Sequence, residues 1–158
     1  LGLKGFNIKK EVIGGTQRIS VSGIHQSKES NNQLAFNYES RGTQSLFFTL
    51  AEILYALKNN SIAIIDEIEL GFHPEALIKL ISYFIEQRKK GKAQLLFSSN
   101  SLVFMNEFDM HQIYLVEKND KGASIVYRLN KVKGIRPDEN FQSKYMSGSY
   151  GAFPKIRT

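Results

Sequence analysis

The sequence predicts an α/β fold in which a mainly parallel sheet is flanked by helices and preceded by antiparallel strands. From residue 34 onward, apolar patterns typical of a strand alternate with patterns typical of a helix, and this order favours parallel strands. Residues 61–65 and 94–97 are short apolar runs, as is typical of strands buried in a parallel sheet. The first 38 residues instead show an alternating pattern that predicts β-structure.

The N-terminal region is expected to contain a hairpin. Apolar residues lie in extended patterns around Ile8 and Val21, and Gly14-Gly15 between them is a turn signal. Residues 25–33 are polar and predict a loop or hairpin tip. Residues 34–38 alternate again, as in a half-buried strand.

Two amphipathic helices are predicted on either side of the apolar run 61–65. Between Leu46 and Leu57, apolar residues recur at spacings of three and four, and Asn59-Asn60 ends this pattern. Pro74 is well placed as the first residue of the second helix. The basic residues between 88 and 92 end it, because cations are favourable at a helix C-terminus.

The remaining chain is expected to hold smaller elements. The pattern predicts a short helix near residues 102–107, then strands at 113–116 and 124–129 around a turn at 119–122. With 158 residues and no internal repeat, we expect a single domain over residues 1–158.

Composition excludes several classes of protein. The chain has no cysteine, which excludes a disulfide scaffold and a thiolate metal site. It has three histidines far apart in sequence, which argues against a zinc centre. No apolar run approaches the roughly 18 residues of a membrane span, so we expect a cytoplasmic protein with no membrane partner. The net charge of +6 is compatible with nucleic acid or phosphate ligands, or with a merely solvated surface.

The chemistry-bearing feature is the pair Asp66 and Glu67, directly after the apolar run 61–65. Ligands of open α/β sheets bind beyond the carboxyl ends of the strands. An aspartate there can serve Mg²⁺, and the adjacent glutamate can orient or deprotonate a water molecule. The alternative is an acidic pair at an ordinary strand exit.

Polar segments upstream and downstream add to this pair. Residues 39–44 open the first helix, where Ser40 offers a hydroxyl, Gly42 allows close backbone approach and the free N–H groups can bind an anion. The alternative is a simple N-cap by Ser40 or Thr43. Further along, residues 69–74 precede the second helix, and residues 98–101 follow the strand 94–97.

Taken in order, these segments resemble the C-terminal half of an ABC-type ATPase domain of the AAA family, in the soluble branch that includes SMC-type and RecF-type proteins. Residues 40–44 resemble the ABC signature, residues 62–67 resemble Walker B with its catalytic glutamate, residues 70–74 resemble the D-loop, and residues 98–100 resemble the switch segment. Four motifs in the right order are far more specific than one. The resemblance covers residues 34 to 117 and implies the C-terminal lobe of a P-loop NTPase-like fold.

The tail carries a second likeness. Residues 134–138 and 144–154 resemble the ending of a bacterial ATPase subfamily that accompanies phage-defence, abortive-infection or restriction-linked systems. The alternative is a structural closing loop, since glycine and proline there are ordinary turn residues.

The resemblance also implies cofactors and residue roles. ATP and Mg²⁺ would bind between two facing domains of a homodimer or higher oligomer. Asp66 would serve Mg²⁺, Glu67 would activate water, and Asn100 would occupy the switch position. His73 would communicate between the two sites of the dimer. The nucleotide-binding residues implied are Ser40, Gly42, Thr43, Gln44 and His73.

Three departures from the family pattern matter. The sequence has no Gly-x-x-x-x-Gly-Lys-[Ser/Thr], which in the family lies upstream of the signature. With a first residue Leu1 instead of methionine, we interpret the chain as a C-terminal fragment that lacks the Walker A portion and is inactive alone. Asn100 stands where the family has histidine, and Arg41 replaces a commoner small residue. Slow hydrolysis is therefore expected, and for Asn100 the reason is that asparagine cannot become a cation.

The function implied is ATP binding and hydrolysis, with ATP-dependent dimerisation that drives a defence effector, such as a nuclease partner, or a DNA-related process. One alternative is a catalytically weak, ATP-gated scaffold, which Asn100 favours. Another is a DNA-repair ATPase that binds duplex DNA directly, which would show a steep dependence of affinity on salt.

Overall fold

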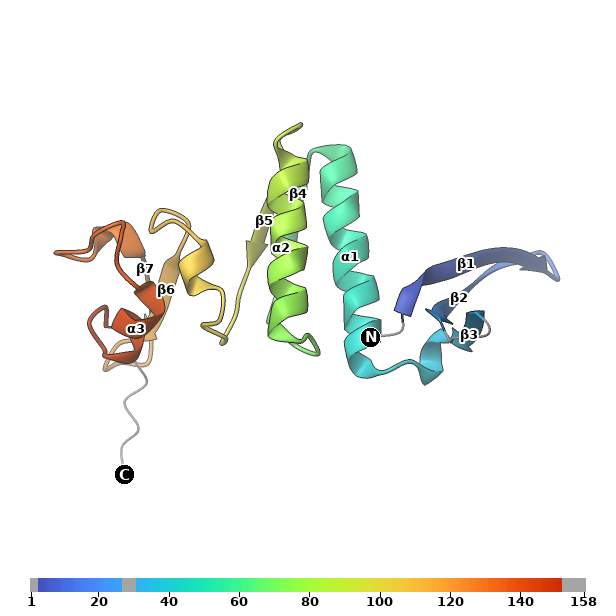
Figure 1. The fold of residues 1–158 in the computed structure, drawn as a ribbon, viewed down its shortest axis with the longest axis horizontal. Coiled ribbons are helices and arrows are strands. Elements are labelled where there is room, and N and C mark those ends of the chain that lie inside the picture. Colours follow the sequence, from blue (N-terminus) through green and yellow to red (C-terminus); the bar gives the residue numbers. More distant parts are fainter. Residues whose placement is uncertain (1–2, 27–30, 152–158) are drawn as a thin grey trace, which may run out of the picture. The chain divides into compact units, whose positions relative to one another are not determined.

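A computed structural model of the chain describes residues 3–26 and 31–151. The chain divides into two compact units, with the boundary between Ser99 and Asn100. The first unit holds the two long helices and most of the strands, and the second holds a hairpin and short helices (Figure 1). Each unit is described by itself below.

The first unit begins with an antiparallel sheet of β1 (Leu3–Ile13), β2 (Thr16–Gln26) and β3 (Asn31–Ala35), in the order β1-β2-β3. Gly14 and Gly15 form the predicted turn with φ of 58° and 79°, a conformation that glycine adopts without strain. The hairpin and the N-terminal antiparallel strands are therefore confirmed.

At the ends of this sheet, one sequence-based expectation is met in part and another fails. The polar segment 25–33 lies between antiparallel strands β2 and β3, as expected of a hairpin, but the strands extend into it, because His25 pairs with Asn32 and backbone bonds do not depend on side-chain polarity. Residues 27–30 of that segment lie outside the described residues. The strand expected over 34–38 stops at Ala35, and η1 (Phe36–Tyr38) is a 3-10 turn.

Aromatic packing explains why the chain turns there. The ring centroid of Phe47 in the following helix lies 5.0 Å from that of Phe36 and 4.9 Å from that of Phe6 in β1. These edge-to-face contacts stabilise beyond simple burial. They hold the start of the helix against the sheet, and an extended Phe36–Tyr38 would break this cluster.

The centre of the first unit contains α1 (Arg41–Asn59), β4 (Ile62–Ile65), α2 (Pro74–Arg88) and β5 (Gln94–Phe97). All four predicted elements are confirmed. β4 and β5 pair in parallel, and the two helices lie side by side (Figure 1). Their shared core contains Ile53, Leu80, Phe84 and Ala93, with Ile65 and Leu95 packed against it.

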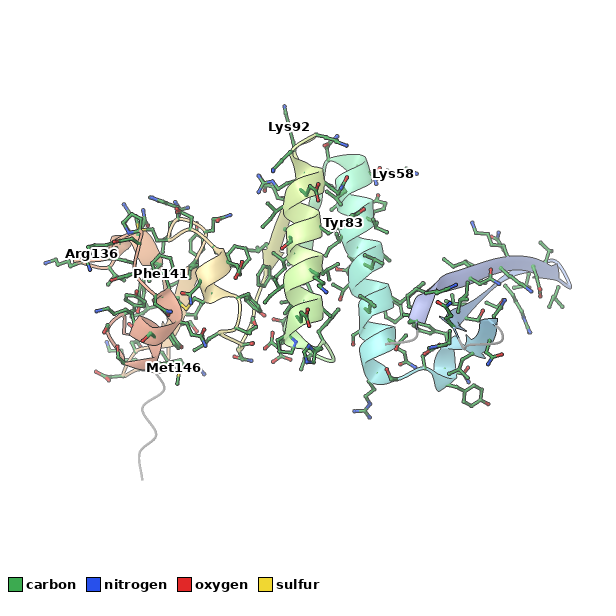
Figure 2. All side chains as sticks on the ribbon, viewed as in Figure 1. Lys58, Tyr83, Lys92, Arg136, Phe141 and Met146 are labelled. Carbon is green, nitrogen blue, oxygen red and sulfur yellow. The ribbon has the colours of Figure 1, made fainter. Side chains whose placement is uncertain are left out.

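The ends of both helices follow the sequence signals. α1 ends at Asn60, whose φ of 52° gives the left-handed cap, and α2 begins at Pro74. The basic residues after α2 are exposed, as expected for a solvated cluster at a helix C-terminus. Figure 2 shows Lys58 and Lys92 at this same end of the helix pair.

The expected burial of the parallel strands on both faces is wrong for the described residues. Ala63 is buried beneath the helices, whereas Ile62, Ile64 and Leu96 on the other face are 57%, 69% and 58% exposed. The parallel sheet has two strands among the described residues, β4 and β5, and the other two described sheets are antiparallel, so the fold is mixed α/β with a small parallel sheet. Both helices lie on one face, and no described element covers the other.

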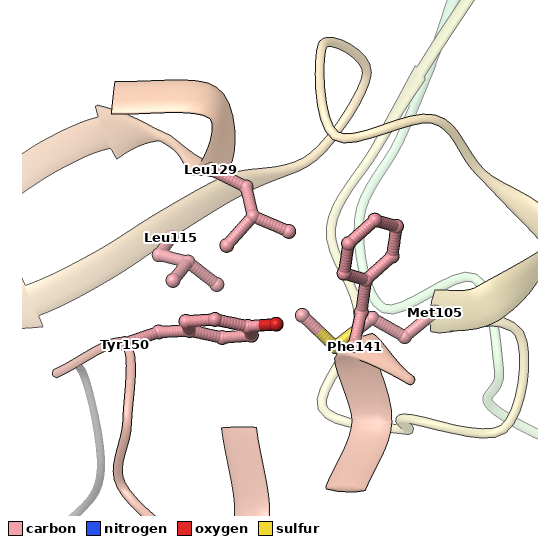
Figure 3. Packing of buried hydrophobic residues seen from close by; sticks show 5 residues of the cluster. All are labelled: Met105, Leu115, Leu129, Phe141 and Tyr150. Carbon is pink, nitrogen blue, oxygen red and sulfur yellow. The ribbon is translucent and has the colours of Figure 1, made fainter. Parts of the chain in front are cut away.

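The second unit is built around the hairpin of β6 (Tyr114–Lys118) and β7 (Ser124–Arg128), which confirms the two expected strands and their turn. The short helix expected at 102–107 is a single 3-10 turn, η2 (Met105–Glu107). Another 3-10 turn, η3 (Leu129–Lys131), follows β7, and α3 (Phe141–Met146) lies in the tail, where the sequence indicated a loop. Figure 3 shows the five core side chains: Met105, Leu115, Leu129, Phe141 and Tyr150.

Hydrogen bonds fix the tail to this core. The Tyr150 hydroxyl donates to Glu139 Oε1 at 2.7 Å, and the Tyr127 hydroxyl donates to the Tyr150 carbonyl at 2.7 Å. Burial, with the hydrogen bond to Glu139 next, raises the pKa of Tyr150 above the usual tyrosine range. A structural role for the described part of the Tyr- and Gly-rich tail is therefore confirmed.

Across the described ranges, no helix has both the length and the apolar character needed to cross a membrane.

Candidate functional site

The carboxylates Asp66 and Glu67 lie where two parallel strands end. The register pairs Ile65 of β4 with Phe97 of β5, so the residues after each strand come side by side. The Ser98 hydroxyl donates to Asp66 Oδ1, and the Glu67 N–H donates to Ser98 Oγ at 2.9 Å. The structure thus brings the expected Walker B and switch segments into direct contact.

A second polar contact joins the same two segments. Ser99 Oγ donates to Glu69 Oε2 at 2.6 Å, and backbone bonds link Ser98 to Ile65 and to Ile68 at 3.0 and 3.1 Å. Ser98 lies in the expected switch segment and Glu69 just before the expected D-loop, but the sequence predicted neither as a site residue. The parallel register of the two strands is the signal that would have found Ser98, because it opposes Asp66.

The backbone of Glu67 is in an uncommon conformation. Its φ is 47°, in the left-handed region that favours glycine, and its side chain is exposed. A non-glycine residue in this region costs free energy of about 1–3 kcal/mol, and such residues cluster at functional sites. The hydrogen bond from the Glu67 N–H to Ser98 is one contact that maintains this conformation.

The expected signature segment forms the first turn of α1. Ser40 is the N-cap, because its Oγ accepts from the Thr43 N–H at 3.1 Å and lies 2.9 Å from Thr43 Oγ1. The Gln44 side-chain amide donates to the carbonyls of Phe36 and Glu39 at 2.9 and 3.2 Å. The capping interpretation of Ser40 is therefore confirmed, and the cap satisfies the Thr43 N–H, one of the backbone donors that a helix N-terminus leaves without a partner inside the helix.

The signature and D-loop segments meet at two glycines. A Cβ built on Gly42 would lie 2.3 Å from the Gly71 carbonyl oxygen, so only glycine fits there. Gly71 has a φ of 81°, and a Cβ there would lie 3.0 Å from Gly42 Cα and 3.2 Å from Ser45 Oγ. Within this chain Gly42 therefore lies close to the backbone of residue 71, and the approach of an anionic ligand to Gly42 stays a prediction.

His73 is the N-cap of α2. Its Nδ1 accepts from the Glu75 N–H at 3.3 Å, and the residue is exposed. Sequence reasoning missed this capping role because histidine is not among the preferred N-cap residues. The communicating role of His73 stays a prediction.

Asn100 follows Ser99 directly and is the first residue of the second unit. Asparagine is a common helix N-cap, so capping the next short helix is an alternative role for this residue. That helix, η2, has Phe104 at its N-cap position, so Asn100 does not cap it. Its place in the switch stays a prediction.

The donors around Asp66 are compatible with a magnesium ion held together with a nucleotide. Among the described residues, no group of three or more histidine, aspartate or glutamate side chains gathers into a metal-binding cluster. Mg²⁺ in nucleotide sites is held by one or two carboxylates, with waters and substrate phosphates completing its shell. Exposed Asp66, with the Ser98 hydroxyl beside it, fits that pattern.

Comparison with known proteins identifies a family and a fold. Residues 4–106, well over half of the chain, match a family described as "AAA domain, putative AbiEii toxin, Type IV TA system". A solved structure from work on "ATP-driven dimerization and DNA stimulated activation of SMC ATPases" is 19% identical with a TM-score of 0.56, covering 82% of this chain and 78% of that chain. At this identity the likeness shows the fold alone. No protein of curated function matches the chain.

Proposed function

Because the chain belongs to the AAA domain family that its residues 4–106 match, and has a mixed α/β, P-loop NTPase-like fold, we propose that it forms the Walker B and signature half of an ABC-type ATPase. This half would bind and hydrolyse ATP between two facing copies. The supporting observation is the contact of Asp66 and Glu67 with Ser98 at the carboxyl ends of β4 and β5.

The chemistry follows from these side chains. Asp66 and Ser98 would hold the magnesium ion of the nucleotide, which supplies charge neutralisation at the phosphates when bound. Glu67 would accept a proton from the attacking water, and its left-handed backbone would set the direction of its side chain. The bond between Ser99 and Glu69 would hold the two segments in register.

The first turn of α1 would act on the nucleotide of the facing copy. Ser40 and Thr43 would offer hydroxyls and Gly42 an N–H group at a helix N-terminus, which is a favourable place for an anion. The Gln44 side chain bonds to the carbonyls of Phe36 and Glu39, just before this turn, so we assign it to ordering the segment. His73 caps the neighbouring helix and would link the two sites of the dimer.

The phosphate-binding loop would come from polypeptide outside these 158 residues, since the sequence contains no such motif. The exposed apolar face of β4 and β5 supports this proposal. Parallel strands in proteins are covered on both faces, so the polypeptide that supplies the loop would also cover this face. The whole assembly would drive a defence effector, such as a nuclease, or a DNA-related process.

A second candidate function is an ATP-gated scaffold with weak hydrolysis. The residue after Ser98-Ser99 is Asn100, and this favours the scaffold: if that position is the switch, an amide would replace the histidine that supports the attacking water, and an amide cannot carry a positive charge. In that case ATP-dependent dimerisation persists while turnover is slow.

The test is Glu67→Gln in the complete ATPase, where the loop is present. Glutamine keeps the size of the side chain but removes the base, so turnover should fall by roughly 10²–10⁴-fold while ATP still binds. The ATP-bound dimer should accumulate, as measured by size-exclusion chromatography with light scattering. Glu75→Gln, which removes an exposed carboxylate of α2, is the matched control. Unchanged turnover in Glu67→Gln would show an ordinary acid at a strand exit.

A further inference from the structure

The residue before the signature turn is a buried carboxylate. The side chain of Glu39 is 2% exposed, and its Oε1 lies 2.7 Å from Nε2 of His25 in β2. Burial of a carboxylate is unfavourable unless it is hydrogen-bonded, so this contact is required by the location of Glu39. His25 itself is 33% exposed and reaches Glu39 from the three-stranded sheet.

The sheet leaves a space shaped for this carboxylate. A Cβ built on Gly23 of β2 would lie 2.0 Å from Glu39 Oε1 and 3.2 Å from His25 Nε2. Gly23 has no left-handed φ that would require glycine. The absence of a side chain at position 23 is therefore explained by the room that Glu39 occupies.

Covalent and hydrogen bonds connect Glu39 to the first turn of α1, which contains the expected signature segment, residues 40–44. Glu39 immediately precedes the N-cap Ser40, and the Glu39 carbonyl accepts from the Gln44 side chain at 3.2 Å. The Glu39 N–H donates to the Phe36 carbonyl at 3.2 Å. A displacement of Glu39 therefore displaces Ser40 and the first turn of α1.

We propose that His25 and Glu39 are positioning residues whose contact anchors the signature turn, residues 40–44, to the three-stranded sheet. The inference rests on the proposed function, in which Ser40 and Gly42 meet the nucleotide of the facing copy. The anchor sets where these groups lie and does not itself touch the nucleotide. Its loss weakens ATP-dependent dimerisation and leaves ATP binding by the single copy unchanged.

The experiment uses the complete ATPase in the Glu67→Gln background, in which the ATP-bound dimer accumulates. His25→Ala removes the partner of Glu39, and Gly23→Ala displaces the carboxylate while both partners remain. His25→Gln retains an N–H donor of similar reach. Gln33→Ala is the matched control, because it removes two exposed hydrogen bonds, from Asn7 and Ser22, on the same sheet.

The readouts are the dimer dissociation constant with ATP by sedimentation, ATP affinity by a fluorescent analogue and thermal stability. His25→Ala and Gly23→Ala should weaken the dimer by about tenfold or more, since small misplacements of a positioned group have large effects. Both should bind ATP like the parent, and His25→Gln and Gln33→Ala should dimerise like the parent.

Three results would overturn the inference alone: normal dimerisation of His25→Ala, equal weakening in His25→Gln, or loss of ATP affinity in proportion to stability. A Glu67→Gln parent that does not dimerise with ATP would overturn the proposed function and the inference with it. A dimerising parent that is insensitive to His25→Ala leaves the proposed function intact, so the two failures are distinguishable.

Discussion

At the scale of single residues, the side chains of the candidate site also maintain local structure. Ser40 and His73 are helix N-caps, and Ser98 bonds both Asp66 and the Glu67 backbone. Loss of an N-cap side chain costs about 0.5–2 kcal/mol of stability. Alanine substitutions at these positions therefore change stability and chemistry together. Tests of mechanism at the site need substitutions that leave the caps in place.

Asn100 allows such a test, because Phe104 and not Asn100 lies at the N-cap of η2. In the complete ATPase, Asn100→His should raise or preserve turnover, since imidazole both hydrogen-bonds and accepts a proton. Asn100→Ala should lower turnover by up to roughly 10²-fold, the scale for losing one donor aimed at the transition state. ATP affinity should be nearly unchanged in both.

Steady-state hydrolysis rates per folded molecule check this prediction, with the melting temperature as a control. If both variants lose stability and neither changes turnover per folded molecule, Asn100 has a structural role and the hydrolytic site is completed elsewhere.

At the scale of elements, the segments before α1 and α2 are held together by backbone packing. Gly42 in the first turn of α1 approaches the carbonyl of Gly71, just before α2. The opposing group is backbone, which cannot rotate away as a side chain could. The relative position of the signature and D-loop segments in this unit therefore depends on glycine, which has no side chain, at both Gly42 and Gly71.

Gly42→Ala separates two opposing effects. Alanine is the better helix former by about 1 kcal/mol, so propensity alone predicts a more stable chain. A Cβ at 2.3 Å from the Gly71 oxygen predicts the opposite, because overpacking costs about 1–3 kcal/mol. We expect net destabilisation, measured by urea unfolding of this chain. Gly5→Ala, with nothing within 4 Å of the new Cβ, is the control and should be near neutral. A stabilised Gly42→Ala would contradict the close approach.

Also at this scale, the sequence predicted the elements in which an apolar pattern repeats over many residues, and it missed the short elements that tertiary contacts determine. The helices α1 and α2 follow from repeated apolar spacings. The six residues of α3 are too few for such a pattern, and η1 forms because Phe36 packs on Phe47. The proximity of Asp66 to Ser98 could have been predicted from the sequence, because both residues directly follow strands that were expected to be parallel neighbours. The contact of Glu39 with His25 could not have been predicted in this way, because it depends on where the three-stranded sheet lies relative to the start of α1.

At the scale of the whole molecule, the uncovered face of β4 and β5 is the main departure from the sequence-based expectation. Ile62, Ile64 and Leu96 have the composition of a buried strand but lie exposed. In the proposed complete ATPase, further polypeptide would cover this apolar face, because parallel sheets in proteins are covered on both faces. The mismatch locates the face on which the proposed additional polypeptide would pack.

Ile64→Ser tests this placement by comparing two forms of the protein. In the 158-residue chain, Ile64 is 69% exposed, so the substitution should change the unfolding free energy by less than about 0.5 kcal/mol. In the complete ATPase, burial of the same side chain would make its loss cost about 2–5 kcal/mol, as for other large-to-small core changes. Ile53→Ala, at a position with 0% exposure, should be costly in both forms and serves as the control. Denaturant unfolding measures both. An Ile64→Ser variant that is equally mild in both forms would show that this face remains open, and the phosphate-binding loop would then have to reach Asp66 without packing on the sheet.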